Sequence, residues 1–289
     1  MPSQTIESQE HRAPQPPTGG LHLSEWGAEL AGTAILVFVA LSNATVLFHP
    51  GWVFEDWIPS ESARRVLLGT VFVAGLTTIA RSPLGRLSGA HLNPAVTLAF
   101  WITGHVHPHD LVGYWAAQLT GGALGAFALR IAWGQTAADI DYGAITPEVA
   151  PWAGVLVEAL MVGLVVCAVF GCLSTHALVR WTPLVAGTVV TLNYWLGAPF
   201  THSGLNPART LGPNLVTGQW QDWWVYVVGP LAGAALVAVA WRMAPRVILT
   251  AKLFHDPDYR SVLRTHLPAR GPAVAQTPGS PAPEPYEPL

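Results

Sequence analysis

The tripeptide Asn-Pro-Ala occurs twice in the chain, as Asn93-Pro94-Ala95 and as Asn206-Pro207-Ala208, each time in apolar surroundings. The lead-in is repeated as well, because Ser-Gly precedes both copies and a leucine stands directly before each asparagine. Asparagine is a strong helix N-cap and proline is preferred at the first helical position, so each copy predicts the start of a helix. Two such starts in an apolar chain indicate two short helices that are aimed at a common point.

The composition is typical of a membrane protein with several spans and fits a soluble enzyme poorly. Hydrophobic residues make up 51% of the chain, charged residues 11%, and the mean hydropathy is +0.38. A net charge of −3 argues against a nucleic-acid partner. About 20 apolar residues cross a bilayer as a helix. Six segments come close to that length: Trp26–Phe48, Ala63–Ala80, Leu111–Trp133, Pro151–Leu173, Pro183–Pro199 and Trp223–Ala244.

The two tripeptides lie in segments too short to span, Leu87–Gly104 and Ser203–Val216. About ten helical residues rise roughly 15 Å, half of the hydrocarbon thickness, so we expect re-entrant half-helices. Three spans separate the copies, so the two halves of the chain must have opposite orientations. Glu29 and Glu158 stand at matching places in the first and fourth spans. The predicted fold is an all-α membrane protein with six transmembrane helices and two re-entrant half-helices in an inverted repeat.

The ends of the chain are predicted to be tails. We expect a disordered cytoplasmic N-terminal tail at 1–24, a channel domain at 25–248 and a Pro-rich cytoplasmic C-terminal tail at 249–289. With both termini inside, ten arginines and lysines lie on the cytoplasmic side and three lie outside, which agrees with the positive-inside rule. The expected location is a cell membrane, crossed several times.

The arrangement resembles the aquaporin, or major intrinsic protein, family over roughly residues 25–244. The resemblance is carried by both Asn-Pro-Ala boxes, the arginine after the second, Glu29-x-x-Gly32-Thr33, Tyr114-Trp115-Ala116-Ala117-Gln118 and Val228-Gly229-Pro230. Among the branches, the chain is most similar to nodulin-26-like and related bacterial members, through residues 206–213 and 224–230. The resemblance implies a homotetramer in the lipid bilayer, with one pore in each protomer and no cofactor.

The boxes also predict how such a pore would treat charge. Each half-helix has the positive end of its dipole at the tripeptide, and two such ends at the midplane disfavour a cation or a hydrated proton. We expect Asn93 and Asn206 to cap their own helices through the side-chain oxygen, which leaves the amide N–H groups free to donate into the pore. A water between two donors must turn its oxygen to both, and this breaks a continuous proton wire.

Four residues are predicted to form a selectivity filter. Arg209 is ionisable and stands beside a helix start at membrane depth, where such groups are usually functional. The resemblance places it at the outer filter, together with Val73, Tyr194 and Ser203 by their offsets from the boxes. Ala74 is the expected replacement for Val73 if an insertion or deletion shifts the register. The alternative for Val73 and Tyr194 is ordinary core packing, and for Arg209 a salt bridge that fastens a loop.

Several other polar residues are expected to support the fold. The resemblance implies that Glu29 and Glu158 hold backbone N–H groups of the re-entrant loops, although intramembrane carboxylates can also relay protons. Gln118 is expected to bond a carbonyl of such a loop. The alternating histidines of 105–109 either bind a metal, sense pH or lie in a solvated turn. No metal site is predicted, and an effect of His202 on the pH dependence of permeation is a further hypothesis.

The predicted function is a passive transmembrane channel for water and small uncharged solutes that excludes protons and ions. The alternative is a facilitator of glycerol or of neutral metalloid acids such as arsenous or boric acid, which the small Val73 would favour. Thr210 stands where glycerol facilitators have aspartate, which weighs against glycerol. A third hypothesis is a closed-pore membrane scaffold that recruits partners through its Pro-rich tail. No catalytic residue set and no P-loop is present, so we do not expect an enzyme.

Overall fold

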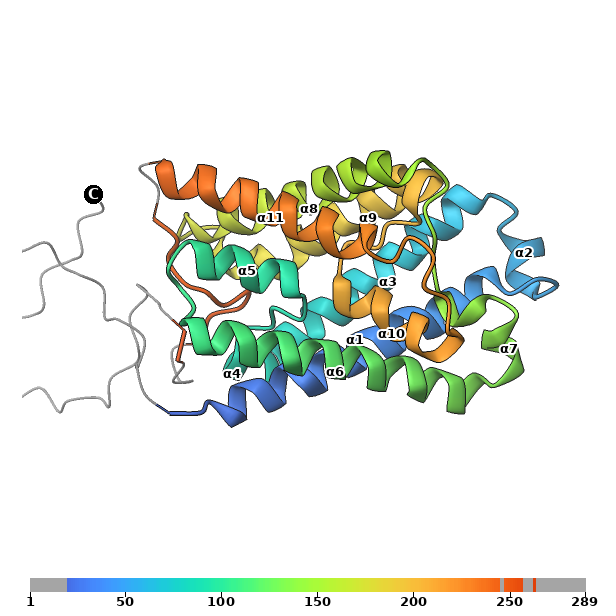
Figure 1. The fold of residues 1–289 in the computed structure, drawn as a ribbon, viewed down its shortest axis with the longest axis horizontal. Helices are drawn as coiled ribbons and strands as arrows, with labels where there is room; N and C mark the ends of the chain where they lie inside the picture. The colour runs from blue at the N-terminus through green and yellow to red at the C-terminus, as the bar shows by residue number, and fades with distance from the viewer. Residues whose placement is uncertain (1–19, 245–246, 257–261, 264–289) are drawn as a thin grey trace, which may run out of the picture.

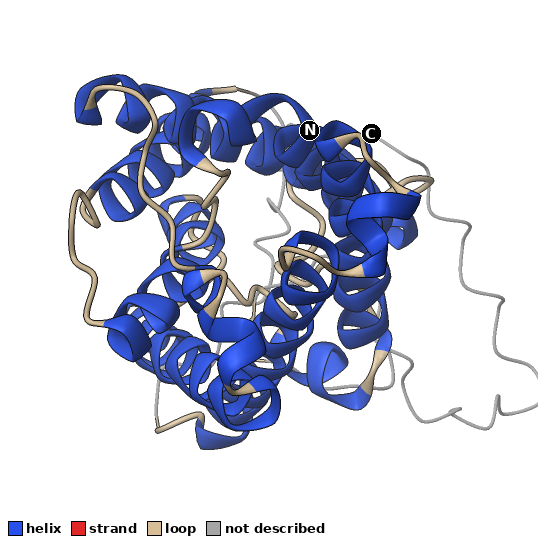
Figure 2. Ribbon diagram, turned by 90° about the vertical axis from the view of Figure 1, so that its right-hand side faces the viewer, coloured by secondary structure: helices blue, strands red, loops and turns tan. Residues whose placement is uncertain are grey.

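Six long helices form the frame of the molecule in a computed structural model that describes residues 20–244, 247–256 and 262–263 (Figure 1). They are α1 (Leu23–Phe48), α3 (Glu61–Arg81), α6 (Pro108–Trp133), α8 (Pro151–Leu173), α9 (Thr182–Thr201) and α11 (Val225–Met243). Each overlaps one predicted span and differs from it by a few residues at its ends. Viewed from the end, the helices surround the middle of the molecule (Figure 2).

Short helices complete the described part of the chain. They are α2 (Val53–Trp57), α4 (Pro83–Ser88), α5 (Pro94–Ile102), α7 (Gln135–Ala138), η1 (Asp141–Gly143), η2 (Val179–Trp181) and α10 (Pro207–Thr217). Two of them, α5 and α10, begin at the prolines of the Asn-Pro-Ala boxes and have 9 and 11 residues. They lie between the long helices, α5 toward one end of the molecule and α10 toward the other (Figure 1). This is the predicted pair of re-entrant half-helices.

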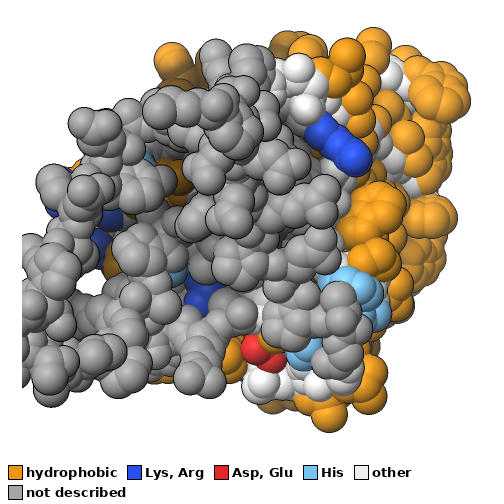
Figure 3. All heavy atoms as spheres, turned by 90° about the vertical axis from the view of Figure 1, so that its left-hand side faces the viewer, with side chains coloured by type: hydrophobic (Ala, Val, Ile, Leu, Met, Phe, Trp, Pro, Cys, Tyr) orange, Lys and Arg blue, Asp and Glu red, His pale blue; other side chains and the backbone are white. Residues whose placement is uncertain are grey.

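Length and composition alone mark four of the helices as membrane spans: α1, α3, α8 and α11. The other two long helices, α6 and α9, have 26 and 20 residues, and at 1.5 Å per residue each is about 30 Å long or more. Their hydropathy is lowered by the glycines, tyrosines and amides with which they pack inside the protein. Large apolar side chains such as Ile131, Leu160 and Leu236 are exposed on the outside of the molecule. An apolar flank is also visible in Figure 3, as a protein in lipid requires.

The two halves of the chain pack in the same way. Helix α1 lies against α6, and α8 lies against α11 in the second half. Helices α3 and α9 meet across the two halves, with a glycine of each facing the other helix. A Cβ added to Gly69 would lie 2.6 Å from the Cα of Thr191, and one added to Gly187 would lie 3.0 Å from the Cα of Val73. Small residues at matching places therefore let the two backbones approach closely, as is common in membrane helices.

The segment 247–256 follows α11 and returns to the core. Ile248, Ala251, Lys252 and Leu253 are all buried, and the segment lies at the end of the molecule where α1 begins (Figure 1). This part of the predicted C-terminal tail is therefore packed against the helices. Of the N-terminal tail predicted at 1–24, residues 1–19 lie outside the described residues and α1 begins at Leu23; of the C-terminal tail predicted at 249–289, residues 257–261 and 264–289 lie outside them.

Candidate functional site

Each asparagine of the two boxes caps its own half-helix. The Asn93 Oδ1 atom accepts a hydrogen bond of 2.9 Å from the backbone N–H of Ala95, and the Asn206 Oδ1 atom accepts one of 3.0 Å from Ala208. The prolines follow at the first helical position, where the missing N–H has no partner to lose. Both helix starts therefore direct their positive dipole ends toward the centre of the molecule.

The amide groups of the same asparagines connect the two half-helices. The Asn93 Nδ2 donates to the carbonyl of Leu205 at 3.0 Å, and the Asn206 Nδ2 donates to the carbonyl of Leu92 at 2.8 Å. Both leucines have positive φ values, 51° and 60°. The expectation that the amide N–H groups stay free needs correction: one N–H of each amide is used between the loops, and one remains to face the cavity.

Two buried carboxylates hold the loops that lead into the boxes. Glu29 accepts the backbone N–H groups of His91 at 3.0 Å and of Leu92 at 2.7 Å. Glu158 accepts those of Gly204 at 2.8 Å and Leu205 at 2.7 Å. The carboxylates also accept hydroxyl hydrogen bonds of 2.7 Å, from Ser88 and Thr201 respectively. With four and three donors aimed at them, these groups have the geometry of fixed loop anchors.

Gln118 joins the first anchor from α6. Its Nε2 donates to Glu29 Oε2 at 2.7 Å and to the Thr97 hydroxyl at 2.9 Å. The expected partner was a loop carbonyl, and the structure places a carboxylate and a hydroxyl there instead. Gln118 thus connects α1, α5 and α6 around one buried carboxylate.

A cavity of about 60 Å³ runs between the half-helices, room for several waters at about 10–15 Å³ each. Its polar lining groups include both box asparagines, Tyr194 and Arg209, and its apolar wall includes Val162, Val165 and Val169 of α8. A solute in it would therefore meet hydrogen-bonding groups on one side and an apolar surface on the other.

Arg209 lines this cavity and is 9% exposed. Its guanidinium donates to the carbonyl of Gly143 at 3.4 Å, from a loop in which Tyr142 and Gly143 both have positive φ values. Among the described residues, no carboxylate forms an ion pair with it. The guanidinium is thus held by a loop carbonyl, with its charge left available to the cavity.

Phe72, and not Val73, lines the cavity beside Tyr194 and Arg209. The rings of Phe72 and Tyr194 meet edge to face, with centroids 6.1 Å apart. Val73 packs toward Gly187 of α9 and lines a separate hollow between α3 and α9, together with Ala74. The expected filter residue Val73 and its replacement Ala74 therefore do not line this cavity, whereas the neighbouring Phe72 does. Each residue turns a helix by 100°, so a shift of one position exchanges an aliphatic wall for an aromatic one.

Ser203 is buried, but its side chain is turned away from the cavity. The hydroxyl donates to the backbone carbonyl of Asn193 at 2.7 Å, whereas Gly204, Leu205 and Asn206 of this loop line the cavity. The structure thus brings Tyr194, Arg209 and both asparagines together, and does not bring the side chains of Val73 and Ser203 to them.

Sequence reasoning missed Leu253, which lines the cavity from the segment after α11. The available signal was the apolar run Val247–Leu249, which continues past the last span. The three histidines of 105–109 do not form one cluster. His105 is 3.1 Å from the carbonyl of Ile248, whereas the rings of His107 and His109 are tilted at 51° to each other with centroids 4.2 Å apart. His202, the candidate for pH dependence, contacts Glu148 at 3.0 Å on the surface.

Comparison with known proteins gives a family match over most of the chain. The family model described as "Major intrinsic protein" matches residues 21–241. The lens fiber major intrinsic protein of Gallus gallus is 34% identical over 239 residues, covering 80% of this chain and 85% of that protein. Aquaporin NIP1-1 of Zea mays is 31% identical, over 74% of this chain and 71% of that protein.

Other similar proteins carry different branch names. The probable aquaporin TIP4-2 of Oryza sativa subsp. japonica is 38% identical over 175 residues, covering 60% of this chain and 68% of that protein. Among solved structures, the aquaglyceroporin from Plasmodium falciparum aligns with a TM-score of 0.64 over 77% of this chain and 96% of that chain. At 20% identity, this last likeness concerns the fold alone.

Proposed function

The chain belongs to the major intrinsic protein family of passive membrane channels, and from that premise we propose that its pore is selective for water, with Phe72, Tyr194 and Arg209 as the filter. A family member conducts water or small uncharged solutes across a membrane and is not an enzyme. Family membership leaves open which residues line the filter and which of these solutes pass through it.

The geometry around the boxes supports exclusion of protons and cations. Two helix N-termini point to one place, and each asparagine keeps one amide N–H for the cavity after the cross-loop hydrogen bonds are made. Arg209 adds a full positive charge that no described carboxylate pairs with. A water at this place is held as an acceptor, and a cation meets three positive potentials in succession.

The proposed filter favours water over larger neutral solutes. The rings of Phe72 and Tyr194 meet edge to face. With the Arg209 guanidinium they leave a narrower opening than a filter in which a valine took the place of Phe72. A wide filter was expected because Val73 was placed in it. Val73 faces α9 instead, so this reason does not apply. Glycerol and neutral metalloid acids remain the alternative solutes, and entry of either through the wild-type filter would contradict the proposal.

Assembly and orientation are part of the same proposal. We infer a homotetramer with one pore per protomer from family membership, in a cell membrane with both termini in the cytoplasm. The positive-inside count supports that orientation, as does the position of α1 and of the segment 247–256 at the same end of the molecule (Figure 1). A closed-pore scaffold is the second candidate, favoured by Leu253 at one end of the cavity.

A pair of neighbouring substitutions tests the filter. We would reconstitute Phe72→Ala and Val73→Ala in liposomes and follow light scattering after osmotic jumps with sucrose and with glycerol. Both proteins would carry Leu253→Ala, so that this side chain does not limit the flow. Glycerol entry should rise in Phe72→Ala and stay at the parent level in Val73→Ala. Equal glycerol entry in the two variants would sink the assignment of Phe72.

A further inference from the structure

Two histidines and an aspartate gather where α1 and α6 begin. His22 precedes α1, and His109 and Asp110 lie in the first turn of α6. The His22 Nδ1 is 2.7 Å from Asp110 Oδ1, and the His109 Nε2 is 3.3 Å from His22 Nδ1 and 3.5 Å from Asp110 Oδ1. Figure 3 shows histidine side chains on the surface at this end of the molecule.

These separations fit a metal ion. Ligand atoms at 2.0–2.1 Å from a tetrahedral zinc lie about 3.3 Å from one another. Two of the three separations already have that length, and the third needs to open by about 0.6 Å. Imidazole nitrogens and a carboxylate oxygen are the ligand types that suit zinc and related divalent d-block ions.

Asp110 gives an independent reason to place a cation here. Its side chain is fully buried, and its Oδ2 atom has no hydrogen-bond partner among the described residues. The Trp26 indole N–H donates to Oδ1 at 3.0 Å and fixes the carboxylate, as outer partners do in metal sites. The aspartate charge also offsets the two helix N-termini, which alone would repel a cation. We propose that His22, His109 and Asp110 form a site for a divalent d-block cation, zinc first, that fastens the start of α1 to the start of α6.

The full-length protein in detergent tests this proposal with Co²⁺ as a visible probe of four-coordinate sites. One Co²⁺ per protomer should bind and be displaced by Zn²⁺. His109→Ala should weaken binding by about 100-fold or more, and His202→Ala, which removes a surface histidine outside this cluster, should leave it unchanged. No bound Co²⁺, or equal binding by wild type and His109→Ala, would overturn the site. Helical circular dichroism checks that each variant is folded.

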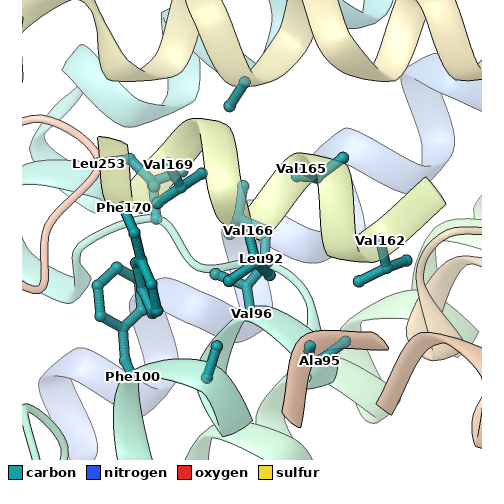
Figure 4. Close-up of a cluster of buried hydrophobic side chains, with 14 of the residues drawn as sticks. Leu92, Ala95, Val96, Phe100, Val162, Val165, Val166, Val169, Phe170 and Leu253 are labelled. Atoms are coloured by element: carbon teal, nitrogen blue, oxygen red, sulfur yellow. The ribbon is translucent and has the colours of Figure 1, made fainter. Parts of the chain in front are cut away.

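A second inference concerns the segment 247–256 and rests on the proposed channel function. The segment 247–256 crosses the end of the cavity, and Leu253 is 3% exposed there. Its side chain lies beside Val169 and Phe170 of α8 (Figure 4). The same side chain lines the cavity together with Leu92 and Val96. An apolar side chain at the end of a narrow water path removes the hydrogen bonds that water needs to enter.

The segment is held by the loops that form the pore. The Leu253 N–H donates to the carbonyl of Gly89 at 3.0 Å, and the His91 ring donates to that of Ala251 at 2.8 Å. Both partners belong to the loop before the first Asn-Pro-Ala box, which Glu29 anchors. At the edge of the segment, Asp256 pairs with Arg86 at 2.8 Å, where the arginine is partly exposed. We infer that the segment 247–256 is an intramolecular plug that seats Leu253 in the pore mouth and opens by undocking.

The plug is tested by the water permeability of the full-length protein in liposomes, with two matched substitutions that shorten a side chain of the segment. Leu253→Ala should raise permeability by about tenfold or more, because a minor open state is populated at roughly 10% or less. Val247→Ala shortens an aliphatic side chain of the same segment that is 58% exposed, and should change nothing. Asp256→Asn, which breaks the ion pair at the edge, should raise permeability by a smaller factor.

The outcomes separate the plug from the channel. Fast and equal water flow in wild type and Leu253→Ala would overturn the plug and leave the channel intact. No flow above that of empty liposomes in any of the variants would overturn the water pore, and the plug with it.

Discussion

At the scale of single residues, the pore depends on buried polar groups that hold one another in place. Glu29 and Glu158 take the backbone N–H groups of opposite loops, and Asn93 and Asn206 exchange hydrogen bonds between the same loops. In a low-dielectric interior such networks are stable only when their members are satisfied. Exchanging one member should therefore affect the fold before it affects selectivity.

Glu158→Gln should be strongly destabilising. Gly204 and Leu205 donate to different oxygens of the carboxylate, so the substitution directs an amide NH₂ at one of these two donors and leaves only a neutral acceptor for the other. Hydrogen bonds to a charged group contribute about 1.5–3 kcal/mol each, so we expect a loss of about 3 kcal/mol or more. Thermal unfolding in detergent measures it. Glu148→Gln, at a surface carboxylate that is 60% exposed, is the control and should unfold like wild type.

Arg209→Val should let cations and protons pass. The substitution removes the one full charge among the described cavity-lining polar groups Asn93, Asn206, Tyr194 and Arg209, while the loop carbonyl of Gly143 loses only a long hydrogen bond of 3.4 Å. A pH-sensitive dye inside liposomes would report the leak, in a Leu253→Ala background that keeps the mouth open. An unchanged proton flux in Arg209→Val would show that the helix dipoles alone exclude protons.

At the scale of elements, the half-helices were predicted more accurately than the positions on the long helices. Asparagine and proline define a helix start chemically, so α5 and α10 begin where the boxes predict. No such marker fixes the rotation of α3, and counting back from the first box crosses the turn at Ser82 and the short helix α4. One residue of difference there moved the expected filter from Phe72 to Val73.

The docking of the segment 247–256 could not be predicted for a related reason. Leu253 and Ala251 stand in a stretch without helix or strand periodicity, and their partners Gly89 and His91 are far away in the sequence. Composition assigned this stretch to the beginning of a Pro-rich tail, whereas long-range hydrogen bonds determine its position. The position of His22 beside His109 could not be predicted for the same reason, because the two histidines are 87 residues apart in the sequence.

Lys252 makes the docked segment sensitive to alkaline pH. Burial lowers the pKa of its ammonium group from 10.5 to about 8, although the negative charges of Asp256 and Glu25 act in the opposite direction and raise it. Its Nζ donates to the carbonyl of Arg86. The undocked lysine holds its proton up to the higher pKa, so raising the pH through the window from about 8 to 10.5 favours docking. Below about pH 8 both states are charged and the balance stays constant.

Water permeability should therefore fall as the pH rises from 8 toward 10. Stopped-flow light scattering at matched ionic strength measures the profile. Lys252→Met, which keeps the buried length of the side chain without the charge, should have a flat profile over the same range. A decline of equal steepness in wild type and Lys252→Met would assign the effect to another group.

At the scale of the whole molecule, two halves of opposite orientation bring two helix N-termini to one cavity. The inverted order could be read from three spans lying between two equal motifs, because an odd number of crossings reverses the second half. Family membership then supplies the passive channel. In the proposed channel, the width of the filter and the state of the mouth depend on Phe72, Tyr194, Arg209 and Leu253, which sequence spacing alone did not bring together.

The most direct measurement is the shrinkage of liposomes after an osmotic jump, with sucrose and glycerol side by side, for wild type and Leu253→Ala. We predict fast, protein-dependent water flow in Leu253→Ala, with glycerol entry no faster than in empty liposomes. Rapid glycerol entry at the same protein density would contradict a filter formed by Phe72, Tyr194 and Arg209.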